Sequence, residues 1–415
     1  MASSEITLES VPSASDITAA DWDACANPKA DPNSLENLDT LASSSAAGDS
    51  CIDSRSGYNP FVSHAFFAAA EASGSACART GWGPRHLLAR LDGAVAGIVP
   101  CYLKSHSQGE YVFDRGWADA YERAGGRYYP KLQASVPFTP ATGPRLLIRD
   151  GVDRDRIGEA LASGLMALCN ATNASSVHVT FAREAEAKFL GAHGFLQRND
   201  QQFHWRNDGY RSFDDFLTTL NSRHRKAIKR ERREALSAGI TIHALNGADI
   251  TEDAWDAFFE FYMETGSRKW GRPYLTRKFF SLIGESMARD VLLVMARRNG
   301  RWIAGAINFV GSDTLFGRNW GAVEHHPFLH FEVCYYQAID FAIQRGLKTV
   351  EAGAQGEHKL ARGYLPQTTY SAHYIADPDL RRAIADYLKR ERAYVAEVGR
   401  ELAEAGPFRK SGDEA

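Results

Sequence analysis

Residues 89–97 read ARLDGAVAG, and residues 296–305 read ARRNGRWIAG. In each case an Asp-Gly or Asn-Gly pair lies between two mainly apolar runs, which is a strong short-range signal of a β-hairpin. Each predicted hairpin is followed along the chain by another strand, a loop or turn, a helix and a further strand. This repeated order predicts two copies of one α/β module built around an antiparallel meander.

Hydrophobic periodicity predicts the other elements. Strands are expected at residues 86–91, 95–103, 111–113, 177–181, 202–205, 291–297, 302–310, 314–320 and 349–353. Helices are expected from Pro60 onward, at residues 153–169, 184–192, 253–265 and 329–344, and as one long helix from 212 to 239. The Pro- and Gly-containing stretch after residue 113 is expected to be a long, shaped loop.

Chain length and composition set the domain organisation. A chain of 415 residues is too long for one ordinary core. The expected parts are an N-terminal segment with a flexible insertion (1–58), a first domain (59–208), a second domain (209–400) and a tail (401–415). The insertion, residues 27–58, is rich in Ser, Ala, Asp, Asn and Gly, and such a composition buries little apolar surface.

The bulk charge and the cysteines narrow the class of protein. A net charge of -3 gives no overall attraction to nucleic acid or to an anionic membrane. The six cysteines follow no C-x-x-C spacing, which favours reduced thiols over a disulfide framework or a zinc site. The first ten residues, MASSEITLES, show no signal-peptide pattern, and no apolar run approaches about 18 residues. We therefore expect a soluble, cytoplasmic protein.

Residues 351–374, EAGAQGEHKLARGYLPQTTYSAHY, concentrate side chains that can do chemistry. The stretch follows a predicted strand, and its glycines and proline disfavour a long helix. Acids, bases and hydroxyls crowded onto a bent segment favour a functional site, and the alternative is a surface loop held by ion pairs. Glu351, which ends the strand, is either catalytic or the partner of a basic neighbour such as Arg318.

Several long stretches resemble one bacterial family. They are NPFVSHAFFAA, YVFDRGWADAYERAGGRYYPKLQASVPFTPATGPRLL, QQFHWRN, SRHRKAIKRERREA, TGSRKWGRPYLT, LHFEVCYYQAIDFAI and EAGAQGEHKLARGYLP, spanning about residues 59–374. Together they resemble the Fem-like family of predicted N-acyltransferases, which is related to the Fem-type aminoacyltransferases of peptidoglycan synthesis. The resemblance implies an α/β (α+β) fold with two tandem GNAT-like domains, each a mixed sheet flanked by helices.

The resemblance also implies acyl transfer from acyl-CoA, or from aminoacyl-tRNA, to a small or peptide-borne amine. Typical GNAT proteins hold the CoA pyrophosphate with an R/Q-x-x-G-x-G/A loop. Residues 321–331 stand at that position in the second half and read GAVEHHPFLHF, without the motif. The nearest candidate in the first half is TPATGPR, residues 139–145, which makes Arg145 a candidate phosphate ligand.

Acyl transfer to an amine needs a base, an acid for the leaving group and donors for the developing oxyanion. Glu357 or His358 is the expected base, since a partly dry cleft moves either pKa toward neutrality. Tyr364 is the expected acid. The other residues expected to line this cleft and bind substrate are Lys359, Arg362, Arg318, Trp320, Glu332 and Tyr335.

Further contacts are expected from three other regions. The aromatic, charged loop around residues 117–129 offers Asp119, Tyr121 and Tyr128 for the acceptor, or for packing between the two halves. Arg268, Lys269 and Trp270 form a second candidate contact. Seven Lys or Arg residues lie between positions 223 and 233, and Arg225, Lys226 and Arg230 are expected either to bind phosphate or to form a solvated helix face.

Other kinds of site and function were also considered from the sequence. His325, His326 and His330 match no H-E-x-x-H spacing, so no metal site is expected. Cys334 is expected to be packing rather than a nucleophile. A non-catalytic GNAT-like module that binds a ligand or partner is the third function considered, after acyl-CoA-dependent and tRNA-dependent transfer.

Overall fold

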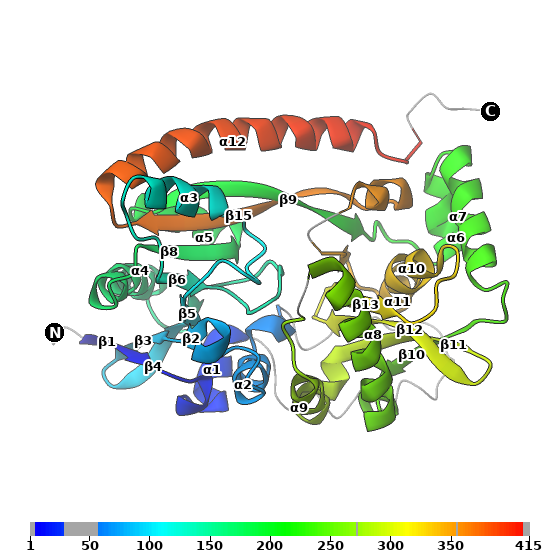
Figure 1. Ribbon diagram of the computed structural model, residues 1–415, viewed down its shortest axis with the longest axis horizontal. Coiled ribbons are helices and arrows are strands. Elements are labelled where there is room, and N and C mark those ends of the chain that lie inside the picture. The colour runs from blue at the N-terminus through cyan, green and yellow to red at the C-terminus, as the bar shows by residue number, and fades with distance from the viewer. Residues whose placement is uncertain (1–4, 29–56, 271–272, 354–355, 410–415) are drawn as a thin grey trace.

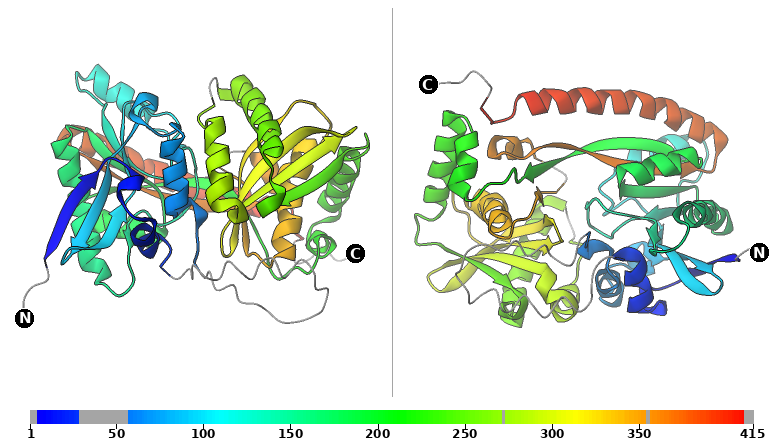
Figure 2. Two further views of the ribbon diagram at one scale, coloured as in Figure 1. Left: turned by 90° about the horizontal axis from the view of Figure 1, so that it is seen from below. Right: turned by 180° about the vertical axis from the view of Figure 1, so that it is seen from behind.

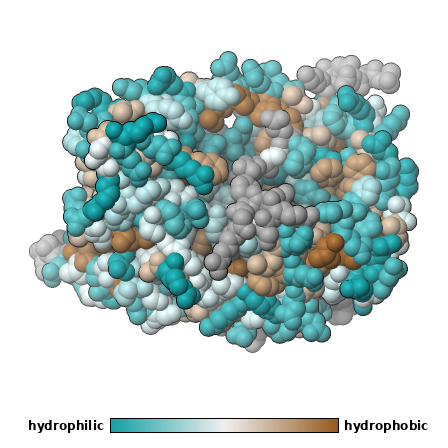
Figure 3. All heavy atoms as spheres, in the orientation of Figure 1, coloured by the Kyte–Doolittle hydropathy of each residue, from teal (hydrophilic) through white to brown (hydrophobic). Residues whose placement is uncertain are grey.

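The computed structural model describes residues 5–28, 57–270, 273–353 and 356–409, without the side chains of residues 267–270 and of Glu357. The chain forms the expected mixed α/β architecture, with two halves of helices and strands that lie side by side (Figure 1, Figure 2). None of the described helices is both long and apolar enough to cross a membrane. The face seen in Figure 3 is mostly hydrophilic, with small scattered apolar areas, as is usual for a folded domain.

The first half contains nine strands and five helices among the described residues. The strands are β1 (Ile6–Val11), β2 (Trp82–Pro84), β3 (His86–Leu91), β4 (Ala94–Val99), β5 (Cys101–Lys104), β6 (Lys131–Ala134), β7 (Leu147–Ile148), β8 (Ser176–Ala182) and β9 (Leu196–Arg206). The helices are α1 (Ala19–Ala26), α2 (His64–Ala72), α3 (Arg115–Arg123), α4 (Arg154–Ala171) and α5 (Glu184–Ala192).

The second half repeats the scheme. Its strands are β10 (Thr241–Asn246), β11 (Val291–Arg298), β12 (Arg301–Val310), β13 (Thr314–Ala322), β14 (Thr349–Glu351) and β15 (Leu365–Ile375). Its helices are α6 (Phe213–Thr219), α7 (Ser222–Ala235), α8 (Glu252–Trp270), α9 (Arg277–Met287), α10 (Leu329–Phe331), a π-helical turn η7 (Glu332–Tyr336), α11 (Gln337–Gln344), a 3-10 helix η8 (Glu357–Arg362) and α12 (Pro378–Glu404).

Both predicted hairpins are confirmed. β3 pairs with β4, and β11 with β12, through turns in which Asp92 and Asn299 each have φ 49° and are followed by a glycine with positive φ. Primed turns of this kind match the twist of the strands they connect. The duplicated order also holds: the meander leads through α4 to β8 in the first half, and through α10 and α11 to β14 in the second.

Four local expectations are wrong. Residues 111–113 are not a strand, because Tyr111 has φ 60° and cannot continue an extended backbone. Residues 115–123 form helix α3 rather than loop, with Trp117 buried against α12. The helix expected over 212–239 is two helices, since Leu220 is extended and the Asn221 side chain caps α7. The end of the 351–374 segment is strand β15 and not a loop.

One sheet of eleven strands runs through both halves in the order β10-β11-β12-β13-β14-β9-β15-β8-β6-β5-β2. β14 pairs with β9 of the first half, and β15 of the second half pairs with β8 and β9. Each half is therefore completed by the last strand of the other. A smaller sheet, β1-β3-β4-β7, flanks the first half. Separating the halves would break the pairing of β14 with β9 and that of β15 with β8 and β9. The domain boundary near residue 208 remains a prediction.

Hydrophobic core packing joins the two halves. One aromatic cluster joins α2 to α9 and the strands of the second half, and it includes Phe61, Phe66, Phe279, Phe309 and Phe316. Two further clusters fill the second half, together with Phe203 and Trp205 of β9, and the first half, together with Ala372 of β15. Helix α12 lies across β9 and β15, spanning the exchanged strands (Figure 1, Figure 2).

Candidate active site

Strands β13 and β14 run parallel but pair only from Thr314 to Phe316, opposite Thr349 to Glu351. β14 ends there, while β13 continues to Ala322. On its other side β13 contains a β-bulge. Ala306 and Asn308 of β12 are two residues apart, but their partners on β13, Trp320 and Gly317, are three residues apart. Bulges re-aim side chains beside active sites. The divergence and the bulge coincide, and they give this edge of the sheet an irregular, partly unpaired backbone.

Glu351 stands at the point of divergence and is only 4% exposed. Its carboxylate lies 3.3 Å from Arg318 Nη2 and 3.9 Å from His204 Nε2. Burial raises the pKa of Glu351 to about 7, although Arg318 and a backbone hydrogen bond from Thr142 oppose the shift. A carboxyl with this pKa can accept or release a proton near neutral pH.

The two neighbours of Glu351, Arg318 and His204, connect it with both halves. The Arg318 guanidinium lies 4.8 Å from the Phe61 ring of the first half and donates to the Gly317 carbonyl. His204 Nε2 donates to Gln202 Oε1, and Gln202 in turn donates to the Pro140 carbonyl. Burial, with Arg318 as the next cause, lowers the pKa of His204 to about 3, so this imidazole is neutral.

The segment after β14 brings a second set of predicted residues close together. Lys359 Nζ donates to the Gly353 carbonyl at 3.0 Å, and burial lowers its pKa to about 8. His358 Nε2 and the Tyr335 hydroxyl are 2.9 Å apart. The Tyr364 hydroxyl is fully buried and donates to the Tyr335 carbonyl at 3.3 Å, and burial raises its pKa well above the usual range.

Arg362 anchors this segment to α7. Its Nη2 donates to both carboxylate oxygens of Glu231 at 2.9 Å, and its Nη1 donates to the His358 carbonyl. The guanidinium also stacks 3.4 Å from the centre of the Phe331 ring. Arg362 therefore fixes the backbone that carries His358 and Lys359, and its expected substrate contact remains a prediction.

A cavity of about 300 Å³ opens beside the continuing part of β13. It is lined by Thr265 of α8, by Trp320 and Ala322 of β13, by residues 324–326 and by Leu329 and His330. The His330 ring lies 5.1 Å from Trp320 and 6.0 Å from His358, so the cavity borders the segment described above. Most of its lining residues belong to the GAVEHHPFLHF stretch, residues 321–331.

Other predicted residues have structural partners. Glu332 is fully buried and receives two hydrogen bonds from Arg232 of α7, at 2.9 and 3.1 Å. Arg145 is 1% exposed, and its guanidinium donates to the carbonyls of Ala141, Pro144 and Thr180. Burial lowers the pKa of Arg145 to about 10. Arg145 thus shapes the TPATGPR loop, and its role as a phosphate ligand remains a prediction.

The remaining predicted residues lie apart from Glu351 or outside the described side chains. Asp119 is exposed on α3, and Tyr121 of the same helix packs against the cluster below α12. On α7, Lys226 and Arg230 are exposed and Arg225 is partly exposed. Arg230 also lies 5.9 Å from the ring of Phe328, next to the cavity wall. The side chains of Arg268, Lys269, Trp270 and Glu357 lie outside the described part of the chain.

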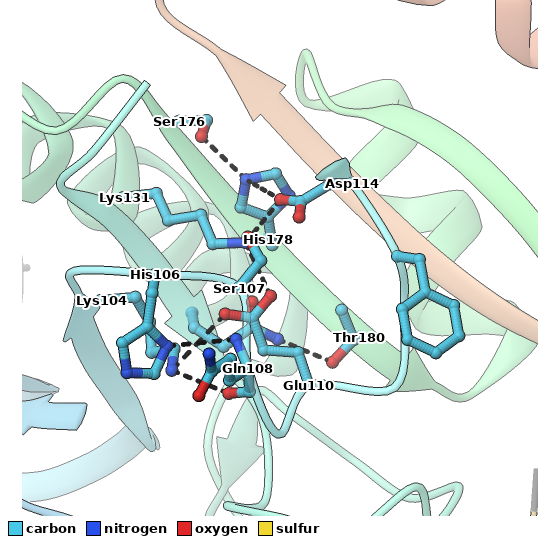
Figure 4. A network of polar contacts seen from close by, with 12 residues as sticks. Lys104, His106, Ser107, Gln108, Glu110, Asp114, Lys131, Ser176, His178 and Thr180 are labelled. Atoms are coloured by element: carbon cyan, nitrogen blue, oxygen red, sulfur yellow. Dashed lines mark hydrogen bonds and ion pairs between the residues drawn. The ribbon is translucent and has the colours of Figure 1, made fainter. Parts of the chain in front are cut away.

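Sequence reasoning missed a buried charge network in the first half (Figure 4). Lys131 is fully buried and lies 2.6 Å from a carboxylate oxygen of Glu110 and 2.5 Å from one of Asp114. Burial opposes its charge, but the two carboxylates outweigh it and raise the pKa of Lys131. Lys104, also fully buried, lies 3.6 Å from Glu110, and burial lowers its pKa to about 7.

The network continues across the sheet. Tyr128, one of the predicted contacts, donates to Asp114 at 2.7 Å and lies 3.3 Å from His178 Nε2. His178 Nδ1 lies 2.7 Å from His373 Nδ1 on β15. In the described part of the chain, Glu110 Oε1, Asp114 Oδ1 and His373 Nε2 have no hydrogen-bond partner. Burying charged groups costs free energy of folding unless they are well paired. A layer of this kind therefore suggests that these residues either have a function or select one folded structure over others.

A local signal for this layer exists in the sequence. Residues 131–135 read KLQAS and residues 176–180 read SVHVT, so polar residues alternate with apolar ones. Alternation places the polar set on one face of the sheet and Leu132, Ala134, Val177 and Val179 in the core on the other. No group of three or more His, Cys, Asp or Glu residues in the described ranges is arranged to hold a metal ion.

The meander, the crossover helix and the parallel pair in each half define a GNAT-like α/β protein. The family model FemAB_like, described as peptidoglycan biosynthesis/recognition, matches residues 13–410. The chain belongs to this family. A search of curated proteins returned no match.

Solved structures of low sequence identity are similar to the chain. FemX is 13% identical, with 76% of this chain and 93% of that chain covered and a TM-score of 0.48. A tandem GNAT protein from the clavulanic acid biosynthesis pathway is 14% identical, with 90% and 99% covered and a TM-score of 0.44. L-PGS from Bacillus licheniformis is 8% identical, with 71% and 86% covered and a TM-score of 0.46.

Proposed function

We propose that the protein is an N-acyltransferase that moves an acyl group from acyl-CoA to an amine at the divergence of β13 and β14. The observation that carries this proposal is Glu351, a buried carboxyl with a pKa of about 7 beside a β-bulge. The family description, peptidoglycan biosynthesis/recognition, favours an amine that is small or carried by a cell-wall peptide as the acceptor.

The donor is proposed to lie along the continuing edge of β13. Backbone N–H groups near the bulge would hold the thioester carbonyl, and such fixed donors stabilise an oxyanion. The cavity beside Trp320 and His330 would take the pantetheine. Because the glycine-rich loop is missing, the phosphates would depend on side-chain cations. The candidates are Arg230 of α7, which lies 5.9 Å from the Phe328 ring, and the exposed Lys226 of the same helix.

The proposed reaction is a direct displacement. The amine nitrogen attacks the thioester carbonyl, forming a C–N bond, and Glu351 takes the proton that the nitrogen loses. Collapse of the tetrahedral intermediate breaks the C–S bond and releases the CoA thiolate. Lys359, whose pKa of about 8 leaves it largely protonated at neutral pH, would give the thiolate a proton. The sequence alone predicts Glu357 or His358 as the base and Tyr364 as the acid. Burial raises the pKa of Tyr364 well above its usual value but lowers that of Lys359 to about 8, so Lys359 is proposed as the acid.

The cytoplasm is the proposed setting, because acyl-CoA and reduced thiols occur there together. All five cysteines that the structure describes, including Cys334, are free thiols.

The proposal predicts a pH dependence. Glu351 must be ionised to act as base, so kcat/KM should fall about tenfold per pH unit below pH 7. In Arg318→Gln the cation that opposes the raised pKa is lost, so the acidic limb should move to higher pH by about one to three units. The measurement is kcat/KM between pH 5 and 9 for both proteins. An acidic limb that is unmoved in Arg318→Gln would exclude Glu351 as its source.

Donor binding tests the proposed function itself. Acetyl-CoA and longer acyl-CoAs, each at about 100 times its Kd, should raise the free energy of unfolding by about 2.7 kcal/mol. Trp320→Ala should remove most of this stabilisation. Trp302→Ala, a partly buried tryptophan on β12 away from the cavity, is the matched control and should keep it. If no acyl-CoA changes the unfolding transition of the unaltered protein, the proposal is wrong.

Aminoacyl-tRNA is a second candidate donor, favoured by the exposed cations of α7. Arg223, Lys226, Lys229, Arg230 and Arg233 are all exposed on this helix. Binding of charged tRNA should then weaken steeply with salt. Neutralising Arg225, Lys226 and Arg230 together should lower the slope of log K against log salt by about 2 to 3.

A further inference from the structure

Helix α7 carries a carboxylate where an apolar residue is expected. Its buried residues, Ile228, Glu231 and Ala235, follow at spacings of three and four, so they form one stripe along the helix. Helix α7 packs against α10, η7 and η8. Glu231 is 8% exposed, and a carboxylate at such a depth needs cationic or hydrogen-bonding partners. Its partners therefore show what this side of α7 holds in place.

Glu231 connects α7 with the segment that carries Lys359. Both of its carboxylate oxygens accept hydrogen bonds from Arg362 Nη2 of η8 at 2.9 Å, and the Tyr336 hydroxyl of η7 donates to the same carboxylate. Charge-assisted hydrogen bonds are roughly twice as strong as neutral ones. Arg362 Nη1 in turn donates to the His358 carbonyl at 2.6 Å. That carbonyl belongs to the peptide bond between His358 and Lys359.

The segment around Lys359 has little stiffness of its own. It lies between Gly356 and Gly363, whose φ angles of 115° and 88° are rarely adopted by other residues. Between these glycines, η8 is a 3-10 helix of six residues, and the hydrogen bonds of a 3-10 helix are poorer in geometry than those of an α-helix. Anchors outside the segment must therefore determine where Lys359 lies.

Lys359 is held next to the candidate base. It is 3% exposed, and its Nζ donates to the carbonyl of Gly353, two residues beyond Glu351. Burial is the main cause of its lowered pKa, Cys334 of η7 raises that pKa, and Arg318 of β13 lowers it further. As long as Cys334 and Arg318 are unaltered, the pKa of Lys359 reports how deeply its side chain is buried.

The next residue of α7 anchors a different segment. Arg232 donates to Glu332 of η7 at 2.9 and 3.1 Å, and it lies 2.7 Å from Asp340 of α11. Glu332 also accepts from Gln337 Nε2 at 2.7 Å. The turn η7 is π-helical, and such turns are frequent at functional sites. Arg232 is thus the charged partner of η7, whereas Glu231 is the charged partner of η8.

Stability alone does not require a buried ion pair at this place. Replacing such a pair with apolar residues of similar volume is often neutral or stabilising. Hydrogen bonds to a carboxylate differ from apolar contacts because they fix direction as well as distance. The pair of Glu231 with Arg362 therefore suits a role in orienting the backbone of η8.

We propose that Glu231 is a positioning residue, which holds Lys359 buried at the end of β14 through Arg362 and does not itself touch the substrate. The role of Lys359 as the acid for the CoA thiolate rests on the proposed acyl transfer. The dependence of its position on Glu231 does not.

Chemical labelling of lysines tests this dependence without any substrate. The protein is treated with acetic anhydride between pH 6 and 10.5, and acetylation of Lys359 is quantified by peptide mass spectrometry. In the unaltered protein, labelling should be slow, with a midpoint near pH 8. In Glu231→Gln the segment should loosen and expose the amine. Labelling should then be faster, and its midpoint should rise by about one unit or more toward the usual 10.4.

Further variants separate positioning from general destabilisation. Glu231→Asp keeps the negative charge and should shift the midpoint less than Glu231→Gln. Arg232→Gln removes the anchor of η7, and it should also shift the midpoint less. Asp214→Asn removes an exposed ion pair with Lys229 of α7 and should leave the midpoint unchanged. An unmoved midpoint in Glu231→Gln, or an equal shift in Arg232→Gln, would overturn the proposal.

Arg362→Lys provides a second variant should Glu231→Gln fail to fold. It keeps a cation opposite Glu231 but replaces the guanidinium, which bridges Glu231 and the His358 carbonyl, with a compact ammonium. The Lys359 midpoint should rise in this variant as well. A midpoint that stays near pH 8 in Arg362→Lys would also overturn the proposal.

Kinetic measurements separate this inference from the proposed function. With acetyl-CoA as donor and methylamine as the probe acceptor, Glu231→Gln should lower kcat by about 10- to 100-fold, as expected for a misplaced catalytic group. The Kd for acetyl-CoA should stay within about threefold. A raised Lys359 midpoint in a protein that transfers no acyl group would support the positioning role and reject the transfer reaction. Transfer with an unchanged kcat in Glu231→Gln would reject the positioning role alone.

Discussion

Replacing Glu351 with glutamine is expected to lower kcat of acyl transfer by about 10² to 10⁴, the usual contribution of a positioned general base. The amide keeps the shape of the side chain but cannot take a proton from the attacking amine. Because Glu351 is buried and neutral in part at pH 7, the variant should remain folded. The measurement is single-turnover release of free CoA, detected by mass spectrometry.

Two controls make this result specific. Glu9→Gln removes an exposed ion pair between Glu9 of β1 and Arg90 of β3, and it should leave kcat unchanged. The Kd for acyl-CoA should stay within about threefold in Glu351→Gln, since the lost interaction belongs to the transition state. A variant that retained full kcat would remove Glu351 from the mechanism and return attention to His358 and Glu357.

Replacing Lys131 with methionine is expected to lower the free energy of unfolding by about 3 to 5 kcal/mol at pH 7. Lys131 is the shared partner of Asp114 and Glu110, and methionine leaves both carboxylates in a buried site. Glu110 keeps a weaker ion pair with Lys104 at 3.6 Å. Asp114 loses the only ion pair with a lysine that it makes among the described residues. The measurement is urea unfolding of the variant and the unaltered protein.

The pH dependence of the Lys131→Met deficit identifies its cause. Without the lysine the pKa values of the two carboxyls rise in the folded state, so the folded variant binds more protons than the unfolded chain. Its stability deficit should therefore shrink as pH falls from 7 toward 5. Adding Asp114→Asn should restore part of the loss, because the stranded charge is then removed. A deficit below about 1 kcal/mol, or one that is independent of pH, would contradict this account of the network.

Local sequence signals were sufficient for part of the fold and the site. Asp92-Gly93 and Asn299-Gly300 could be recognised as hairpin turns because the glycines and their neighbours carry the required backbone conformation themselves. The duplicated module followed from them. The pairing of Glu351 with Arg318 was one of two expected roles for Glu351, since a carboxylate at a strand end needs a basic neighbour.

The exchange of β9 and β15 could not be predicted in the same way. The residues that pair, such as Tyr370 with Asn199, are far apart in sequence, and no local pattern specifies which half a strand will join. The 351–374 segment was therefore expected to be one bent segment, although Thr369 and Ser371 are buried within strand β15. The charge network was missed for the same reason, since Lys131 meets Asp114 and Glu110 only after the loop folds over the sheet.

The most direct test of the account is a crystal structure with a stable acyl-CoA analogue in which a methylene group lies between sulfur and carbonyl. The account predicts that the analogue lies along β13, with its carbonyl oxygen within hydrogen-bonding distance of an N–H near Arg318 or Trp320. Its chain should enter the cavity at His330, and Glu351 should face the carbonyl carbon. An analogue seated between β6 and β8 of the first half, or away from Glu351, would contradict the central claim.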